Sequence, residues 1–152
     1  MKKIIAKNRR AAFEYEILDR FEAGLALVGS EVKSLRDGRA SLAEAYAMIE
    51  EGEAYVCKMH IAPYEPASRL NHDPTRRRKL LLRRREIKRL VGRIAERGLT
   101  LVPLQLYFTK RGFAKIELGL ARGRKLYDKR EALKRRTAQR EMERAYARSR
   151  RG

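Results

Sequence analysis

A short polar segment, residues 29–41 (GSEVKSLRDGRAS), carries side chains suited to binding an anionic polymer. Lysine and arginine bind phosphates, and a carboxylate can accept a hydrogen bond from the exocyclic amine of a base. The single glutamate of the segment therefore suggests base reading in addition to charge attraction. Pairing of Glu31 with a neighbouring Lys or Arg remains an open alternative, because exposed ion pairs are common. The candidate binding residues are Glu31, Lys33, Ser34, Arg36 and Arg39.

A second candidate segment lies near the carboxyl end, where residues 124–151 contain neither Gly nor Pro and are rich in Lys and Arg. Asp128 followed by Glu131 resembles a capping box, and strong helix formers follow. A lone cationic helix with a thin apolar stripe is marginal in water, so we expect a tail that is disordered when free and helical against RNA. An exposed Tyr127 ring before the helix would stack on an unpaired base. The alternative is a basic extension that adds only nonspecific RNA affinity.

Catalytic patterns are few. His72 and Asp73 are adjacent, but they lie in an Asn-His-Asp-Pro sequence typical of a turn. A metal or acid–base role for this pair is the alternative interpretation. The chain has one cysteine, Cys57, which we expect to be buried, and it has no Gly-rich phosphate loop or nucleophile elbow. We therefore expect a protein that is not an enzyme, with no metal and no cofactor.

Net charge identifies the class of partner. The 152 residues carry a formal charge of +19, with an isoelectric point of about 10.7. Residues 76–97 and residues 122–152 each contribute +9, and the rest of the chain is nearly neutral. Such an excess favours a polyanionic partner over a small neutral metabolite. No apolar run approaches the length of a membrane span, and charges interrupt the apolar stretch at the amino end, so we expect a soluble, cytoplasmic protein without a membrane partner.

The pattern of the remaining chain predicts mainly β structure with flanking helices. Many short strands separated by turns favour a small closed barrel. A turn is expected at residues 22–24, and hairpin connections are expected at residues 51–53 and 109–112. One amphipathic helix is expected over residues 84–97, closed by Gly98. A shorter helix is expected over residues 30–36, capped by Ser30, although Lys33 stands where a capping box would have Glu. Residues 80–82 fit either a strand or a helix. The expected strands are residues 13–18, 24–29, 45–50, 54–61, 99–108 and 113–120.

Several longer segments together resemble one known family. They are KNRRAAFEYEI, AGLALVGSEVKSLRDGRASL, HIAPYE, NHDPTRRRKLLL, REIKRLVG, GLTLVPLQLYF and GLARGRKLYDKR, and they span nearly the whole chain. On these residues the sequence resembles the SmpB family, the SsrA-binding proteins that act with transfer-messenger RNA (tmRNA) in bacteria. The GSEVKSLR and DKR stretches are the most specific part of the likeness.

The resemblance implies an oligonucleotide-binding (OB)-type barrel that binds the tRNA-like domain of tmRNA. It also implies delivery of the alanyl-charged RNA, with elongation factor Tu and GTP, to stalled ribosomes. Trans-translation there rescues the ribosome and tags the incomplete protein for degradation. The tail would become helical in the empty mRNA channel of the small subunit. We expect a monomer.

The family motifs also carry site residues onto this sequence. The resemblance implies contacts to tmRNA from Asn8, Glu31, Lys33, Ser34, Arg36 and Lys125. It implies contacts at the decoding centre of the ribosome from Gly123, Tyr127, Asp128, Lys129 and Arg130. One departure is Tyr127, where the family often has His; either ring can stack on a base, but only His would titrate near neutral pH.

The expected organisation is therefore an RNA-binding body, residues 1–121, followed by the basic tail, residues 122–152. Two other classes of function stay open. A structural ribosomal protein would use the tail as an anchor in ribosomal RNA and would be present on every ribosome. An RNA-processing enzyme would cleave RNA with a metal and depend on His72 or Asp73.

Overall fold

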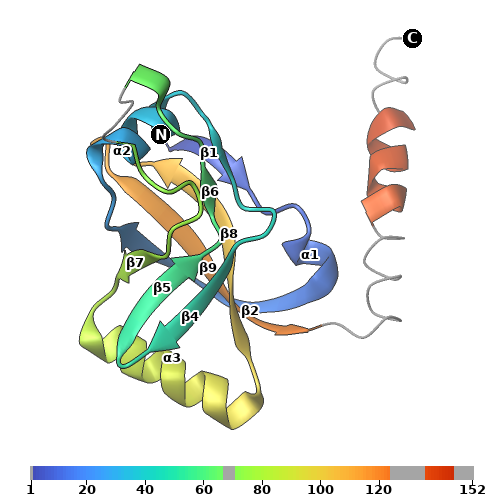
Figure 1. Cartoon of the computed structure of the whole chain (residues 1–152). Helices are drawn as coiled ribbons and strands as arrows, with labels where there is room; N and C mark the ends of the chain where they lie inside the picture. Colours follow the sequence, from blue (N-terminus) through green and yellow to red (C-terminus); the bar gives the residue numbers. More distant parts are fainter. Residues whose placement is uncertain (1, 67–70, 124–135, 146–152) are drawn as a thin grey trace.

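The computed structural model describes residues 2–66, 71–123 and 136–145 (Figure 1). Its main feature is a seven-stranded antiparallel sheet with strand order β1-β8-β9-β2-β7-β5-β4. A small second sheet pairs β3 with β6. The strands are β1 (Lys3–Lys7), β2 (Tyr15–Leu25), β3 (Ala40–Ser41), β4 (Tyr46–Glu50), β5 (Glu53–Cys57), β6 (His60–Ile61), β7 (Arg78–Leu81), β8 (Thr100–Phe108) and β9 (Ala114–Gly123).

The large sheet curls into a barrel because β8 is shared along its length. β1 pairs with the half of β8 that runs from Gln105 to Phe108. The other half begins at Thr100, and the edge strand β4 lies beside it, so the two ends of the sheet approach each other. The expected OB-type barrel with flanking helices is confirmed, whereas β1 itself had no counterpart among the strands expected from the sequence.

The long strand β2 corrects one expectation. Residues 13–18 and 24–29 were expected to be separate strands joined by a turn at residues 22–24. The structure instead has one strand from Tyr15 to Leu25, with a bulge between Ile17 and Asp19. Gly24 serves close packing rather than a turn, since a Cβ atom there would lie 3.1 Å from the Cβ of Leu81 in β7.

Two hairpins form where they were predicted, but the expected strand over residues 54–61 is divided into β5 and β6 at Lys58, which has a positive φ. β4 and β5 are joined by Glu51 and Gly52, which both have positive φ, as a two-residue hairpin turn requires. β8 and β9 pair from Phe108 and Ala114 back to Thr100, with an irregularity after Pro103. Residues 80–82 belong largely to the strand β7, whose Leu80 is fully buried.

Between residues 2 and 123, the described helices that flank the barrel are α1 (Ala11–Glu14), α2 (Gly29–Arg36) and α3 (Arg84–Arg97). α3 begins and ends as predicted, and Gly98 closes it with a left-handed φ of 62°. Its buried residues, Ile87 and Leu90, face the barrel. In Figure 1, α3 lies across one end of the barrel and α2 lies at the opposite end. Residues 13 and 14, expected in a strand, belong to α1.

The apolar core lies inside the barrel. Its fully buried members include Val56, Leu80, Leu106, Ile116 and Leu118, and they come from four different strands. Leu35 of α2 and Leu90 of α3 join the same cluster, so each helix is fixed to the barrel by its apolar face. Cys57 is buried, as expected.

Beyond β9 the structure describes only residues 136–145, which are helical. The Arg136 guanidinium of this segment lies 4.8 Å from the centre of the Phe13 ring of α1. Within the described residues, no helix is long and apolar enough to cross a membrane.

Candidate nucleic-acid interface

Helix α2 carries the polar segment that the sequence singled out. Its N-terminus lies two residues earlier than expected: Val28, not Ser30, occupies the capping position. The Val28 amide donates a hydrogen bond of 3.0 Å to the Glu31 carboxylate, so Glu31 stands where a capping-box glutamate belongs. The expected mismatch at Lys33 therefore does not exist, because the helix begins at Gly29.

Glu31 is completely buried, with 0% of its surface exposed. Its carboxylate accepts hydrogen bonds from Arg76, at 2.5 Å to Nη2, and from Nε of Arg78. Burial by itself would raise the pKa of Glu31, but the hydrogen bonds from Arg76, the Val28 amide and Arg78 outweigh it and lower the pKa. Of the two alternatives for Glu31, ion pairing is the one that the structure contains, and its partners lie about 45 residues away rather than nearby in the segment.

The arginine partners of Glu31 connect α2 to the rest of the barrel. Arg78 is fully buried in β7 and donates further hydrogen bonds to the carbonyls of Met59, at 2.5 Å, and Pro74, at 3.1 Å. Arg76 is partly exposed and also reaches the carbonyl of Ala26. The buried network therefore joins α2, the preceding loop, the 73–76 turn and β7.

The inner face of α2 is committed to the fold at its serines as well. Ser34 is buried and donates a 2.6 Å hydrogen bond to the carbonyl of Ala62. The Ser30 hydroxyl lies 2.9 Å from Nδ1 of His72, whose Nε2 lies 2.9 Å from the Ile61 carbonyl. Since a carbonyl only accepts, Nε2 carries the proton and a neutral ring accepts from Ser30 at Nδ1. His72 thus fastens α2 to β6.

Asp73 completes an Asx-type turn by accepting a 2.9 Å hydrogen bond from the Thr75 amide. The turn interpretation of the His72–Asp73 pair is therefore confirmed. Within the described part of the chain, no group of three or more His, Cys, Asp or Glu side chains is arranged to hold a metal ion.

The outer face of α2 is different, because its cations point to solvent. Lys33 and Arg36 of α2, and Arg39 shortly after its end, are exposed, and among the residues that the structure describes none of them has a carboxylate partner. The Lys33 ammonium lies 5.6 Å from the centre of the Tyr64 ring. Helix α2 is thus anchored by Glu31 and Ser34 and presents Lys33 and Arg36 outward. An anionic ligand at α2 would meet this outward pair and not the buried Glu31 and Ser34.

A second basic stretch follows β1. The side chain of Asn8 donates a 2.9 Å hydrogen bond to the Pro103 carbonyl, and its backbone N–H donates one to the Leu104 carbonyl. These bonds hold the end of β1 against β8, while Lys7, Arg9 and Arg10 on either side of Asn8 are exposed. Asn8 is therefore placed to position its basic neighbours.

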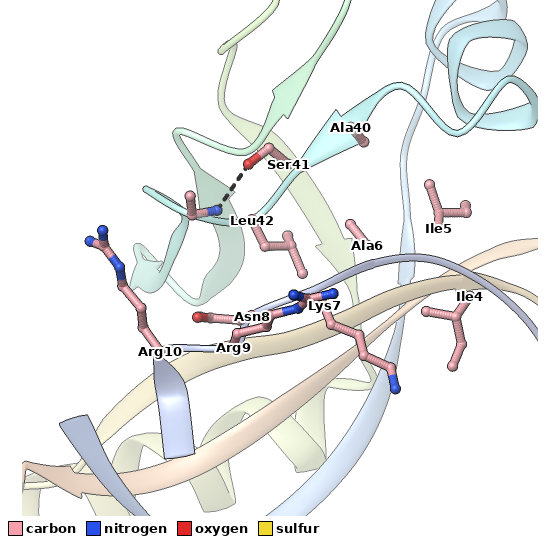
Figure 2. Close-up of a pocket in the computed structure, with 11 residues that line it drawn as sticks. Ile4, Ile5, Ala6, Lys7, Asn8, Arg9, Arg10, Ala40, Ser41 and Leu42 are labelled. Atoms are coloured by element: carbon pink, nitrogen blue, oxygen red, sulfur yellow. Dashed lines mark hydrogen bonds between the residues drawn. The ribbon is translucent and has the colours of Figure 1, made fainter. Parts of the chain in front are cut away.

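Figure 2 shows the groove that this stretch lines. The groove has a volume of about 570 Å³ and lies between residues 4–10 and residues 40–43, the segment that follows α2. The structure thus brings Asn8 beside residues 40–43, although they lie more than thirty positions later in the sequence.

The other basic tract, residues 76–97, is less free than its composition suggests. In addition to Arg76 and Arg78, three of its cations have acidic partners on the barrel: Arg77 pairs with Glu50, Lys79 with Glu53 and Arg93 with Asp19. None of these three pairs is buried; all are exposed or partly exposed. The positive charge of residues 76–97 is therefore partly neutralised by acidic side chains that are distant in the sequence.

Of the predicted decoding-centre residues, Gly123 is the one that the structure describes. Gly123 ends β9, opposite Tyr15 of β2. Lys125, Tyr127, Asp128, Lys129 and Arg130 lie outside the described residues, as does the expected helix start at Asp128.

Comparison with known proteins identifies relatives along most of the chain. Residues 5–148 match the family model described as SmpB protein. An SsrA-binding protein of Carboxydothermus hydrogenoformans is 58% identical over 145 residues, which cover 95% of this chain and 97% of the relative. An SsrA-binding protein of Geobacillus kaustophilus is 57% identical over 144 residues, with coverages of 95% and 92%.

A solved structure is similar as well. It is described as "tmRNA-SmpB: a journey to the center of the bacterial ribosome", and its chain is 52% identical to this one. The superposition has a TM-score of 0.66 and covers 84% of this chain and 92% of the other.

Proposed function

The chain belongs to the SmpB family of SsrA-binding proteins, and from this premise we propose that it binds tmRNA and acts with it in trans-translation. The observation that carries the proposal is the construction of α2. The helix is locked to the barrel by the buried Glu31 network, and this leaves Lys33 and Arg36 presented outward as phosphate ligands. Glu31 and Ser34 then serve binding by holding the helix rather than by touching RNA.

The proposed interface for the tRNA-like domain extends from α2 along the groove to the end of β1. Asn8 holds the strand end, and the exposed Lys7, Arg9 and Arg10 supply further cations. Lys125 of the tail is proposed as an additional contact. The protein would act as an adaptor rather than an enzyme, needing no cofactor.

The basic tail is the proposed ribosome-contacting part. Residues 122–152 would enter the decoding centre and the empty mRNA channel of the small subunit, with Gly123, Tyr127, Asp128, Lys129 and Arg130 at the decoding centre. The helical state of residues 136–145 supports the idea that the tail adopts a helix there. Elongation factor Tu with GTP would join the complex by binding the aminoacylated tmRNA. A monomer working in the cytoplasm is the simplest form of this proposal.

Sequencing of the RNA that copurifies with the protein from a bacterial lysate tests the proposal. We expect tmRNA to be enriched far above transfer RNA and ribosomal RNA. If ribosomal RNA copurified instead, and the protein were present in equal amounts on translating and stalled ribosomes, it would be a structural ribosomal protein. Metal-dependent cleavage of RNA that is lost on His72→Ala would indicate a processing enzyme.

A further inference from the structure

The tip of the β8–β9 hairpin, residues 109–113, presents an aromatic ring to solvent. Phe113 is 62% exposed, more than any other large apolar side chain that the structure describes in the barrel. Single exposed apolar residues are ordinary on protein surfaces. Phe113 differs because its backbone is held rigidly and its neighbours are cations.

Hydrogen bonds fix the hairpin tip. The Thr109 amide donates to the Phe113 carbonyl at 2.9 Å, and the Phe113 amide donates to the Thr109 hydroxyl at 3.2 Å. The Gly112 amide closes the turn on the Thr109 carbonyl at 2.9 Å, with Gly112 at a φ of 86° that other residues rarely adopt. This is a three-residue loop with glycine at its left-handed position, a tight and regular hairpin connection. The Phe113 ring therefore starts from a backbone that is already ordered.

The charge around the ring has one sign. Residues 109–115 (TKRGFAK) contain Lys110, Arg111 and Lys115 and no acidic residue. Lys110 and Arg111 are exposed, and neither has a carboxylate partner within the described residues. An apolar pocket on another protein would accept a bare phenyl ring, but it gives no reason for two flanking unpaired cations. An aromatic face beside cations is the arrangement that binds an unpaired base together with its phosphates.

Strand pairing places this tip at the same end of the barrel as α2. Phe108, just before the tip, pairs with Lys3 of β1. Lys115, just after it, pairs with Gly24 of β2, and β2 leads through residues 26–28 directly into α2. The hairpin tip and the outer face of α2 therefore lie at the same end of the barrel, where one large ligand can contact both.

From these observations we propose that the β8–β9 hairpin tip is an RNA contact in which the Phe113 ring stacks on an unpaired base and Lys110 and Arg111 bind the adjacent phosphates. The proposal rests on the proposed function, because it assigns the base to a loop of the tRNA-like domain. It adds a stacking contact to a surface otherwise described only by its cations.

Substitutions at Phe113 separate stacking from other roles. Phe113→Tyr keeps an aromatic face, whereas Phe113→Leu keeps apolar volume and removes that face. In gel shifts with the isolated tRNA-like domain we expect Phe113→Leu and Phe113→Ala to weaken binding by about 5- to 150-fold, as the loss of one stacked base does, and Phe113→Tyr to stay within about twofold of the unchanged protein. Val91→Ala, which trims another exposed apolar side chain at the opposite end of the barrel, should have no effect.

The salt dependence of binding distinguishes the ring from its neighbours. Phe113→Leu should lower affinity equally at all salt concentrations, whereas Lys110→Ala should reduce the slope of log K against log [salt] by about 0.7 to 0.9. Phe113→Leu binding as tightly as the unchanged protein would overturn the proposal. So would a loss confined to ribosome binding, which would assign the tip to another partner. If the unchanged protein failed to bind the tRNA-like domain at all, the proposed function would fail instead.

Discussion

Glu31 of α2 and Arg78 of β7 form an ion pair in which neither side chain is exposed to solvent. Arg76 provides a second, partly exposed partner, and the carbonyls of Met59 and Pro74 satisfy the rest of the Arg78 guanidinium. Buried charges of this kind are stable only as a complete set, because removing one partner leaves the other charged and unsolvated. The cationic surface of α2 therefore depends on a residue that solvent cannot reach.

Replacing Glu31 by Ala should destabilise the protein by about 3–5 kcal/mol, the cost of leaving a buried arginine without its counterion. Urea unfolding followed by circular dichroism measures this loss. RNA affinity should fall in parallel for the tRNA-like domain and for a generic RNA duplex, because the whole of α2 loses its anchor. Asp19→Asn is the matched control, since it breaks the exposed pair with Arg93 and should cost no more than about 1 kcal/mol.

The contrary outcome for Glu31→Ala is equally definite. Unchanged stability with a selective loss of tRNA-like-domain binding would mean that the carboxylate reads a base directly, which would require the helix to move and expose it.

The Glu31 network also predicts how stability depends on pH. The pKa of Glu31 is lowered in the folded protein, so its contribution is fully present above the ordinary glutamate pKa of about 4.3. That contribution is lost as the pH falls from there through the lower folded-state pKa. We expect the free energy of unfolding of the unchanged protein to drop between pH 5 and the acid range more steeply than that of Glu31→Gln. A difference between the two proteins that is the same at pH 6 and at pH 3 would show that Glu31 is not ionised in the pair.

Local pattern predicted those parts of the fold that local interactions determine. The amphipathic spacing and Gly98 located α3, and turn residues located the β4–β5 and β8–β9 hairpins. The break expected at residues 22–24 was wrong. Gly24 is required there by its close packing against Leu81, which is distant in the sequence, and not by a turn of its own chain neighbours. The strand β1 was missed because its partner, β8, lies a hundred residues away.

The candidate site divides in the same way. The sequence selected α2 and its polar residues, but it did not indicate which of them face the solvent. The partners of Glu31 and Ser34, namely Arg76, Arg78 and the Ala62 carbonyl, follow from tertiary packing that no local spacing reveals. The family resemblance identified Asn8, whose bonds to Pro103 and Leu104 now explain it as a structural anchor.

The end of β9 determines where the tail can be removed without harm to the barrel. The predicted boundary after residue 121 is an expectation that a pair of truncations tests. Deleting residues 124–152 keeps β9 whole, and we expect binding of the tRNA-like domain to stay within about fivefold, the effect of one lost phosphate contact such as that of Lys125. Tagging of proteins made from truncated messages should be abolished in cells.

Deleting residues 121–152 instead removes Ala121, which is fully buried and pairs with Ile17 and Thr100. This cut should lower the free energy of unfolding by about 1–3 kcal/mol through lost strand hydrogen bonds. Equal stability of the two truncated proteins would show that β9 ends earlier than Gly123. A collapse of RNA affinity in the shorter deletion would place the main RNA contact in the tail.

Salt dependence should separate the cations that bind RNA from those that pair within the protein. Lys33 and Arg36 are exposed without a described carboxylate partner, whereas Lys79, also exposed, pairs with Glu53 at 3.1 Å. Each of Lys33→Ala and Arg36→Ala should reduce the slope of log K against log [salt] by about 0.7 to 0.9, the share of one neutralised phosphate, and Lys79→Ala should leave the slope unchanged. Gel shifts with the tRNA-like domain at four salt concentrations give the slopes. Equal reductions for all three variants would mean that the RNA responds to total charge, and that the outer face of α2 is not a defined contact surface.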